Sequence, residues 1–161
     1  MEENGEMGCF LQAWLRALDR PFDGEDLWLA ALTDDSRLVV PGAVFLAYPG
    51  AVYDGRDGIA VALARGARVI VFEPQGFEID VAWQGRALFL PWPGLKRERG
   101  RIAACFYGAP SKEMTMVGVT GTNGKTTCVH WLAQSLEALR LKVALVGTLG
   151  TGFLGDVQGT G

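Results

Sequence analysis

The stretch GVTGTNGKTT, residues 118–127, carries the residue types that bind the phosphates of a nucleoside triphosphate. Gly121 and Gly124 permit a tight turn whose backbone N–H groups point at phosphate oxygens. Lys125 is expected to reach the β- and γ-phosphates, and the Thr126 hydroxyl to ligate Mg²⁺. The rest of the predicted ATP site lines the turn and the first helical residues: Thr122, Asn123 and Thr127. This pattern predicts binding of ATP and Mg²⁺.

The loop differs from the strict G-x-x-x-x-G-K-[ST] pattern in the position of its first glycine. Val119 stands at that position, between Gly118 and Gly121. A chance Gly-Lys-Thr sequence is the alternative explanation. The context favours a phosphate site, because an apolar run at residues 114–120 leads into the loop and a helical pattern at residues 125–139 follows it. The positive end of that helix would then face the phosphates.

The elements around the loop are predicted to be a strand, a helix and a second strand. Apolar residues of the helical segment recur at i, i+3, i+4 and i+7, which is the spacing of one helical face. They are Val129, Leu132, Ala133 and Leu136. Another apolar run covers residues 142–146. We expect a βαβ unit, the first of a P-loop ATP-binding domain.

The residues ahead of the loop predict a small α/β domain. Short apolar runs bounded by Pro and Gly predict strands at residues 43–47, 67–72 and 87–90. Helical patterns occupy residues 9–18, 58–65 and 95–106. The order strand, helix, Gly, strand predicts a parallel crossover. With a linker at residues 107–113, the predicted fold is a small N-terminal α/β domain, residues 1–110, followed by the start of the ATP-binding domain, residues 111–161.

The composition excludes some partners and points to the cytoplasm. A net charge of −3 and a pI near 5.2 give no electrostatic footprint for nucleic acid or an anionic membrane. No apolar run approaches the length that spans a bilayer, and the acidic N-terminus lacks the layout of a signal peptide. The three cysteines show no paired spacing, which favours a reducing compartment. The five tryptophans are assigned to core and domain packing, and the arginines of residues 95–106 to a solvated helix face.

Three stretches in this order resemble the ATP-dependent Mur ligases of peptidoglycan synthesis. They are TDDSRLVVPGAVFLAYPGAVYDGRDGI, FYGAPS, and GVTGTNGKTT followed by VALVGTLGTGFLG. The first stretch is shared by the branch that adds the third peptide residue and the branch that adds D-Ala-D-Ala. The loop and the FYGAPS stretch favour the former, the tripeptide synthetases.

The resemblance implies a UDP-substrate site in the first domain. Ser36 and Asp34 match family positions that contact the UDP part of the substrate. The alternative is a turn residue or helix cap. Some members place a His-Gln-Ala loop against the UDP where this chain has Ala51, Val52 and Tyr53. Two polar side chains are missing there, so backbone groups and Tyr53 must replace them or the pocket must differ. For Arg37, a phosphate contact and a structural ion pair are both open.

The resemblance also implies the reaction. ATP phosphorylates the D-Glu carboxylate of UDP-MurNAc-L-Ala-D-Glu, and the amine of meso-diaminopimelate or L-lysine attacks the acyl phosphate. Lys125 then has a catalytic role, because it neutralises charge on the transferring phosphoryl group. Other family parts have no counterpart here, so we expect an inactive N-terminal piece of a longer ligase. The rival from another class is a non-catalytic UDP-binding module with a relic loop.

Overall fold

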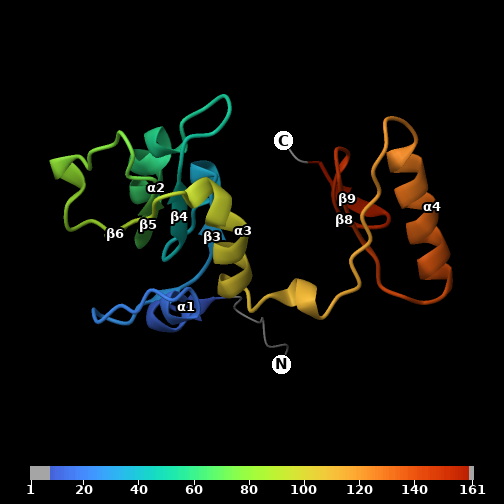
Figure 1. Cartoon of the computed structure of the whole chain (residues 1–161), viewed down its shortest axis with the longest axis horizontal. Helices are drawn as coiled ribbons and strands as arrows, with labels where there is room; N and C mark the ends of the chain where they lie inside the picture. Colours follow the sequence, from blue (N-terminus) through green and yellow to red (C-terminus); the bar gives the residue numbers. More distant parts are fainter. Residues whose placement is uncertain (1–7, 160–161) are drawn as a thin grey trace. The chain divides into compact units, whose positions relative to one another are not determined.

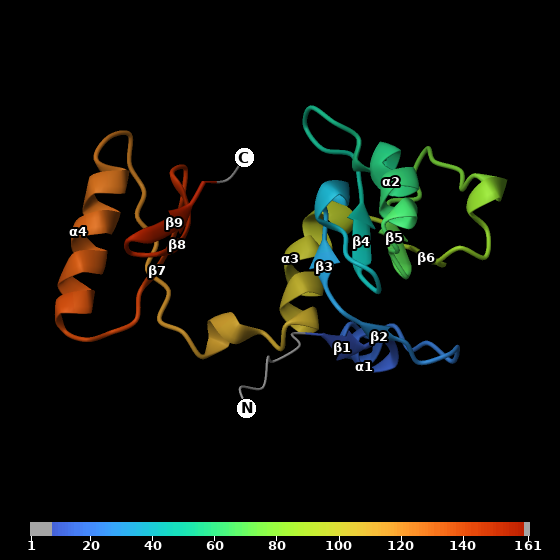
Figure 2. The same ribbon diagram turned by 180° about the vertical axis from the view of Figure 1, so that it is seen from behind.

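The computed structural model describes residues 8–159, so most of the acidic N-terminus, for which no signal peptide is predicted, lies outside the described residues. The chain divides into two units, Met1–Met114 and Thr115–Gly161 (Figures 1 and 2). Among the described residues, the first unit contains two sheets and several helices, and the second contains one sheet and one helix. The assignment of UDP substrate to the first unit and ATP to the second stays a prediction.

A parallel sheet of four strands forms the centre of the first unit. In spatial order the strands are β3 (Leu32–Thr33), β4 (Val44–Ala47), β5 (Val69–Phe72) and β6 (Leu88–Pro91). Each neighbouring pair is parallel. The strands predicted at residues 43–47, 67–72 and 87–90 are confirmed, and so is the parallel crossover. Strand β3 was not predicted, because two residues are too short to show a period.

Helices cover both faces of this sheet, which explains why every residue of β4 and β5 is buried. On one face, α1 (Leu11–Ala17) and α3 (Leu95–Phe106) pack on Val44, Leu46, Val69 and Val71. On the other face, α2 (Ile59–Ala64) packs on Phe45, Ala47, Ile70 and Phe72. The alternation along each strand therefore builds two separate cores.

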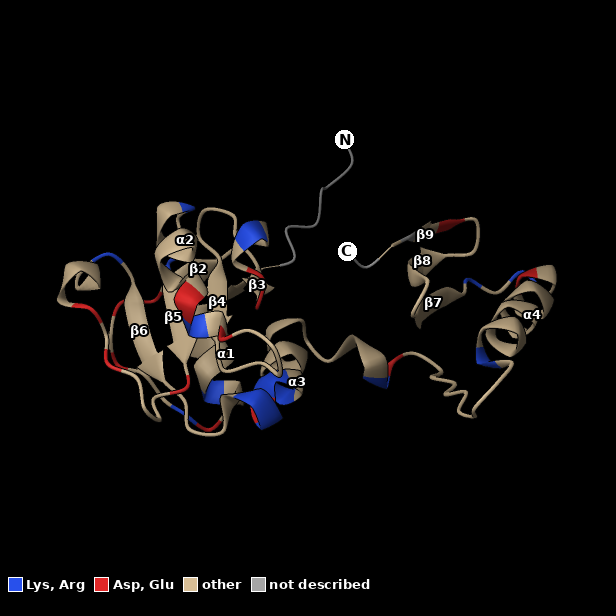
Figure 3. Cartoon of the chain, turned by 90° about the horizontal axis from the view of Figure 1, so that it is seen from above, with Lys and Arg blue, Asp and Glu red and all other residues tan. Residues whose placement is uncertain are grey.

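Short turns and one antiparallel pair complete the first unit. Strand β1 (Cys9–Phe10) pairs with β2 (Trp28–Leu29). Four 3₁₀ turns follow, listed in chain order: η1 (Ser36–Leu38), η2 (Gly55–Gly58), η3 (Val81–Trp83) and η4 (Pro110–Lys112). The arginines of α3 are exposed, as predicted, and its basic residues are coloured blue in Figure 3. Arg101 forms an ion pair with Asp19 at 2.9 Å.

The second unit contains one helix and an antiparallel sheet. Helix α4 (Lys125–Ala138) confirms the predicted helix. Strand β7 (Ala144–Gly147) lies close to the predicted second strand. It pairs antiparallel with β8 (Gly150–Phe153), which pairs in turn with β9 (Asp156–Gln158). Strands β8 and β9 were not predicted, because two glycines in β8 weaken its strand signal. Gly152 is required there, since a Cβ would stand 2.2 Å from the Asp156 carbonyl oxygen.

The strand predicted at residues 114–120 is wrong, and with it the expected βαβ unit. Residues 115–120 form no regular element. A strand needs a neighbour with which to exchange backbone hydrogen bonds, and β7 pairs with β8 instead. A cavity of about 380 Å³ is lined by residues 115–119, by the predicted apolar face of α4 and by residues 143–146. The apolar segment therefore faces the helix without joining a sheet.

The tryptophans divide between core and surface. Trp14 and Trp92 are buried, as the packing assignment expects. Trp131 is 67 % exposed, so its assignment to packing is wrong for this chain. Trp131 is two residues from both Val129 and Ala133, and helix residues two apart do not share a face, so it lies off the apolar face of α4. Within residues 8–159, no helix has both the length and the apolar character needed to cross a bilayer.

Candidate functional site

The phosphate loop has the backbone geometry that its glycines predict. Gly121 has φ +148° and Gly124 has φ +74°, values that favour glycine. Gly124 is the N-cap of α4, and the loop leads directly into the positive end of that helix. The side chain of Lys125 folds back over the loop, where its Nζ donates to the carbonyl oxygens of Gly121 and Thr122. Residues 120–128 are exposed, so the loop is open to a ligand from solvent.

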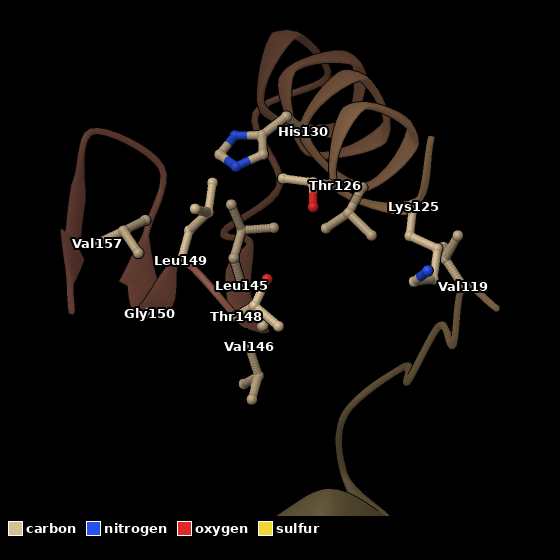
Figure 4. A pocket seen from close by; sticks show the side chains of 12 residues that line it. Val119, Lys125, Thr126, His130, Leu145, Val146, Thr148, Leu149, Gly150 and Val157 are labelled. Atoms are coloured by element: carbon tan, nitrogen blue, oxygen red, sulfur yellow. The ribbon is translucent and has the colours of Figure 1, made fainter. Parts of the chain in front are cut away.

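Beside the loop lies a cavity of about 200 Å³ between the start of α4 and the end of β7 (Figure 4). Its polar side chains are those of Lys125, Thr126, His130 and Thr148. The other predicted loop residues do not line it: Gly121, Thr122, Asn123, Gly124 and Thr127. Of the loop, residues 118–127, the cavity contains Val119 and the two residues predicted to contact the phosphates and Mg²⁺, Lys125 and Thr126.

His130 and Thr148 are two residues of this cavity that the motif did not reveal. A signal for His130 exists, because it follows Thr126 by four residues and therefore shares its helix face. Thr148 follows β7, whose position relative to the loop depends on tertiary structure. Within residues 8–159, no cluster of three His, Cys, Asp or Glu side chains is placed to hold a metal ion. The Mg²⁺ contact of Thr126 stays a prediction.

A second cavity, of about 540 Å³, lies in the first unit at the carboxyl ends of β3 and β4. In open α/β sheets, ligands bind outside the carboxyl ends of the strands. The lining residues are Asp34, Asp35, Ser36, Arg37, Phe45, Tyr53 and Gly55. The cavity brings together Asp34, Ser36 and Tyr53, three of the five residues predicted to contact UDP. Ala51 and Val52 are exposed and do not line it.

An ion pair occupies one wall of this cavity. The Asp35 carboxylate accepts hydrogen bonds from Nε of Arg37 at 3.0 Å and from Nη2 at 2.7 Å. It also caps η1 by accepting from the Arg37 backbone N–H. The side-chain hydrogen bonding from Arg37 is the main cause, and the backbone hydrogen bond the next, of a pKa of Asp35 that is lowered to about 2. Two roles were open for Arg37, a phosphate contact and a structural ion pair, and the structure shows the ion pair.

A second pair, Asp54 and Arg56, ties the loop after β4 to the loop after β5. Nη2 of Arg56 lies 2.7 Å from an Asp54 carboxylate oxygen. Nη1 donates to the carbonyl oxygens of Glu73 at 3.3 Å and Gln75 at 2.7 Å. The guanidinium also stacks over Phe77, 5.1 Å from the ring centroid. Asp54 also caps η2, because its side chain accepts a hydrogen bond from the Arg56 backbone N–H at 3.0 Å.

We expect Asp54→Asn to remove part of the pH dependence of stability in the first unit. The Arg56 hydrogen bond lowers the pKa of Asp54. This contribution is therefore present above the unfolded-state pKa, about 3.9, and is lost as pH falls through the folded-state pKa. It amounts to about 1 kcal/mol, because solvent screens a carboxylate that is about one-third exposed. Urea unfolding at pH 7 and at pH 2.5 measures it.

The control for this prediction is Asp23→Asn, which alters an exposed carboxylate that forms no hydrogen bond or ion pair among residues 8–159. The wild-type chain should lose more stability on acidification than Asp54→Asn does, and Asp23→Asn should behave nearly as the wild type. Equal acid sensitivity of the wild type and Asp54→Asn would contradict the assignment.

Comparison with known proteins places the chain in a family. Residues 29–88, within the first unit, match the family described as "Mur ligase family, catalytic domain". A Pseudomonas putida protein named UDP-N-acetylmuramoyl-L-alanyl-D-glutamate–2,6-diaminopimelate ligase is 47% identical over 137 residues, which are 83% of this chain and 26% of that protein. A Coxiella burnetii protein of the same name is 42% identical over 153 residues, 95% of this chain and 31% of that protein.

Solved structures give the same fold. A structure of a UDP-N-acetylmuramoyl-L-alanyl-D-glutamate–2,6-diaminopimelate ligase matches 90% of this chain with a TM-score of 0.60 at 24% identity, and the match covers 29% of that chain. The D-alanyl-D-alanyl-adding ligase of Acinetobacter baumannii matches 89% with a TM-score of 0.63 at 23% identity, covering 31% of that chain. At these identities the likeness concerns the fold alone.

The chain belongs to the Mur ligase family. Within that family it corresponds to the N-terminal part of the ligases that are named for adding 2,6-diaminopimelate. It spans between about a quarter and a third of the length of the curated relatives that it matches.

Proposed function

We propose that this chain supplies the UDP-substrate pocket and the ATP loop of an ATP-dependent amide ligase of peptidoglycan synthesis. The reaction joins 2,6-diaminopimelate to UDP-N-acetylmuramoyl-L-alanyl-D-glutamate. The observation that carries the proposal is the 42% identity to a ligase of that name over 153 residues, a match that extends through both units. The same name supports diaminopimelate rather than L-lysine as the incoming amino acid.

In this proposal, the UDP part of the substrate binds in the cavity at the carboxyl ends of β3 and β4. The Ser36 hydroxyl and the Asp34 carboxylate offer hydrogen-bonding groups to the uracil and the ribose. Tyr53 supplies an aromatic side chain where other members have a polar loop. Arg37 forms an ion pair with Asp35 and so balances the negative charge of that carboxylate. The pair reduces the electrostatic repulsion between Asp35 and a bound diphosphate.

ATP binds at the loop of the second unit in this proposal. The glycine geometry, the N-terminus of α4 and the Lys125 ammonium fit a triphosphate. The Thr126 hydroxyl is the described group that would hold Mg²⁺, which neutralises phosphate charge when it is bound. Lys125 stabilises the charge that develops as the γ-phosphoryl group passes to the D-Glu carboxylate. The diaminopimelate amine then attacks the acyl carbon, the amide bond forms and phosphate leaves.

We expect the chain to bind the UDP substrate but to form no tripeptide product. The curated relatives are about three times as long as this chain, since 137 and 153 aligned residues make up only 26% and 31% of them. Calorimetric titration with UDP-N-acetylmuramoyl-L-alanyl-D-glutamate tests binding, and a product assay with ATP, Mg²⁺ and diaminopimelate tests turnover. Ser36→Ala should weaken binding about fivefold, the loss of one hydrogen bond.

Ser135→Ala is the matched control, because this serine lies on α4 and its hydroxyl donates only to the Trp131 carbonyl oxygen at 2.8 Å among the described contacts. It should leave binding of the UDP substrate unchanged. Measurable tripeptide product would contradict the expected inactivity. Failure of the unaltered chain to bind the UDP substrate would contradict the proposed pocket.

A further inference from the structure

Tyr48 connects the two walls of the UDP-substrate pocket without lining it. It directly follows β4 and is 8 % exposed, packed in the core beneath α1 and α3. One pocket wall follows β3 and includes Asp34 and Ser36; the other follows β4 and includes Tyr53 and Gly55. Tyr48 hydrogen-bonds to both walls, through its side chain and its main chain respectively.

The side chain of Tyr48 holds Asp34. Its hydroxyl donates to Oδ2 of Asp34 at 2.5 Å. Among residues 8–159, this is the only hydrogen bond to the Asp34 side chain, and no ion pair fixes that carboxylate. The rotamer of Asp34 therefore depends on Tyr48, and a freed carboxylate would lose rotamer freedom each time a ligand bound.

The main chain of Tyr48 holds the other wall. Its carbonyl oxygen accepts a hydrogen bond from the Gly55 N–H at 3.0 Å. A Cβ at position 55 would stand 2.9 Å from that same oxygen, so the close approach needs glycine. This hydrogen bond does not involve the Tyr48 hydroxyl, and the two attachments can be tested separately.

Arg99 orients the Tyr48 hydroxyl from α3. Nη1 of Arg99 donates to the Tyr48 oxygen at 3.0 Å, and its guanidinium lies 5.6 Å from the ring centroid. Because Arg99 occupies an acceptor position of that oxygen, the hydroxyl proton is directed to Asp34. Burial, followed by the hydrogen bond to Asp34, raises the pKa of Tyr48, so the hydroxyl remains a donor at neutral pH.

We propose that Tyr48, oriented by Arg99, is a positioning residue that fixes the Asp34 carboxylate to accept a hydrogen bond from a neutral N–H or O–H group of a uridine nucleotide. The inference rests on the proposed function, since it assigns the ligand of the same pocket. It adds two residues outside the pocket lining to the determinants of substrate affinity.

The test is calorimetric titration of the full chain with UDP-N-acetylmuramoyl-L-alanyl-D-glutamate. Tyr48→Phe removes the hydroxyl and keeps the ring, the packing and the bond to Gly55. We expect its Kd to rise about tenfold, the usual effect of a hydrogen bond to a charged group. Arg99→Met should raise the Kd about threefold, because the hydroxyl loses its orientation but keeps its contact.

A double-mutant cycle separates positioning from a general structural role. In an Asp34→Ala background, Tyr48→Phe should change the Kd less than about twofold, because the carboxylate that it positions is gone. Tyr107→Phe is the matched control. The Tyr107 hydroxyl also bonds to the strand that precedes Asp34, donating to the Leu32 carbonyl oxygen at 3.3 Å, but within residues 8–159 no hydrogen bond joins it to Asp34. Its loss should leave the Kd unchanged.

The outcomes are distinct. A wild-type chain that binds the UDP substrate and a Tyr48→Phe variant with the same Kd would overturn this inference and leave the proposed function standing. Additive effects in the cycle would also overturn it. No binding by the wild-type chain would overturn both. If circular dichroism shows that Tyr48→Phe is misfolded, the exposed Arg99→Met decides, and an unchanged Kd there rejects the proposal.

Discussion

Replacement of Lys125 by alanine is expected to weaken ATP binding by this chain about 100-fold, the upper range for hydrogen bonds to a charged group. The Lys125 ammonium already lies over the loop, where it bonds to the carbonyl oxygens of Gly121 and Thr122. A triphosphate would bring oxygens of opposite charge to this position. The other binding groups of the loop are neutral N–H and hydroxyl groups, so the lysine carries the full positive charge of the site.

The measurement is titration of the chain and of Lys125→Ala with ATP and Mg²⁺. Lys142→Ala is the matched control, because Lys142 is an exposed lysine of the same unit that lies beyond the far end of α4. The control should bind ATP as the unaltered chain does. Equal affinity of Lys125→Ala and the unaltered chain would show that the loop does not bind phosphate. Absence of ATP binding by the unaltered chain would contradict the proposed ATP site of this chain and would fit both a truncated ligase and a non-catalytic UDP-binding module.

Trp14→Ala is expected to cost about 3–5 kcal/mol of stability in the first unit. The indole is 2 % exposed in the core between α1 and α3. Its Nε1–H donates to the Ile102 carbonyl oxygen at 3.1 Å. Its ring meets Phe106 edge to face, with centroids 5.6 Å apart. Alanine would leave a cavity in a packed core and remove the indole donor from that carbonyl.

Urea unfolding followed by circular dichroism measures this loss. Trp131→Ala is the control, since this tryptophan is 67 % exposed and its removal should change the free energy of unfolding by less than about 0.5 kcal/mol. A destabilisation by Trp14→Ala below about 1 kcal/mol would mean that the helices do not close over the sheet as described.

Elements with a strong local signal were predictable. Helix α3 begins at Leu95 and ends at Phe106, as predicted, because its buried residues follow helical spacing and Gly94 precedes them. Strands β4 and β5 were found because strands buried on both faces are continuous apolar runs. Residues 114–120 have the same apolar character, yet they form no strand. Apolar content alone does not provide the neighbouring strand that a ladder requires.

The phosphate loop belongs to the part that local sequence determines. Its glycines, its lysine and the following helix are consecutive, and their backbone geometry depends on residues within one turn of each other. The family resemblance likewise rested on short contiguous stretches. The sequence therefore determined the loop, the main helices, the parallel crossover and the family.

The proposed UDP-substrate pocket depends on tertiary structure. Asp34 and Tyr48 are 14 residues apart, and Tyr48 and Arg99 are 51 residues apart. They meet because parallel pairing brings the ends of β3 and β4 to one edge and because α3 packs across them. The spacing of residues along the sequence does not predict these contacts, because they depend on the register of the strands and on the sheet face against which α3 packs. The sequence predicted Asp34 and Ser36 as substrate contacts. Their proximity to Tyr53, Tyr48 and Arg99 follows only from the folded sheet.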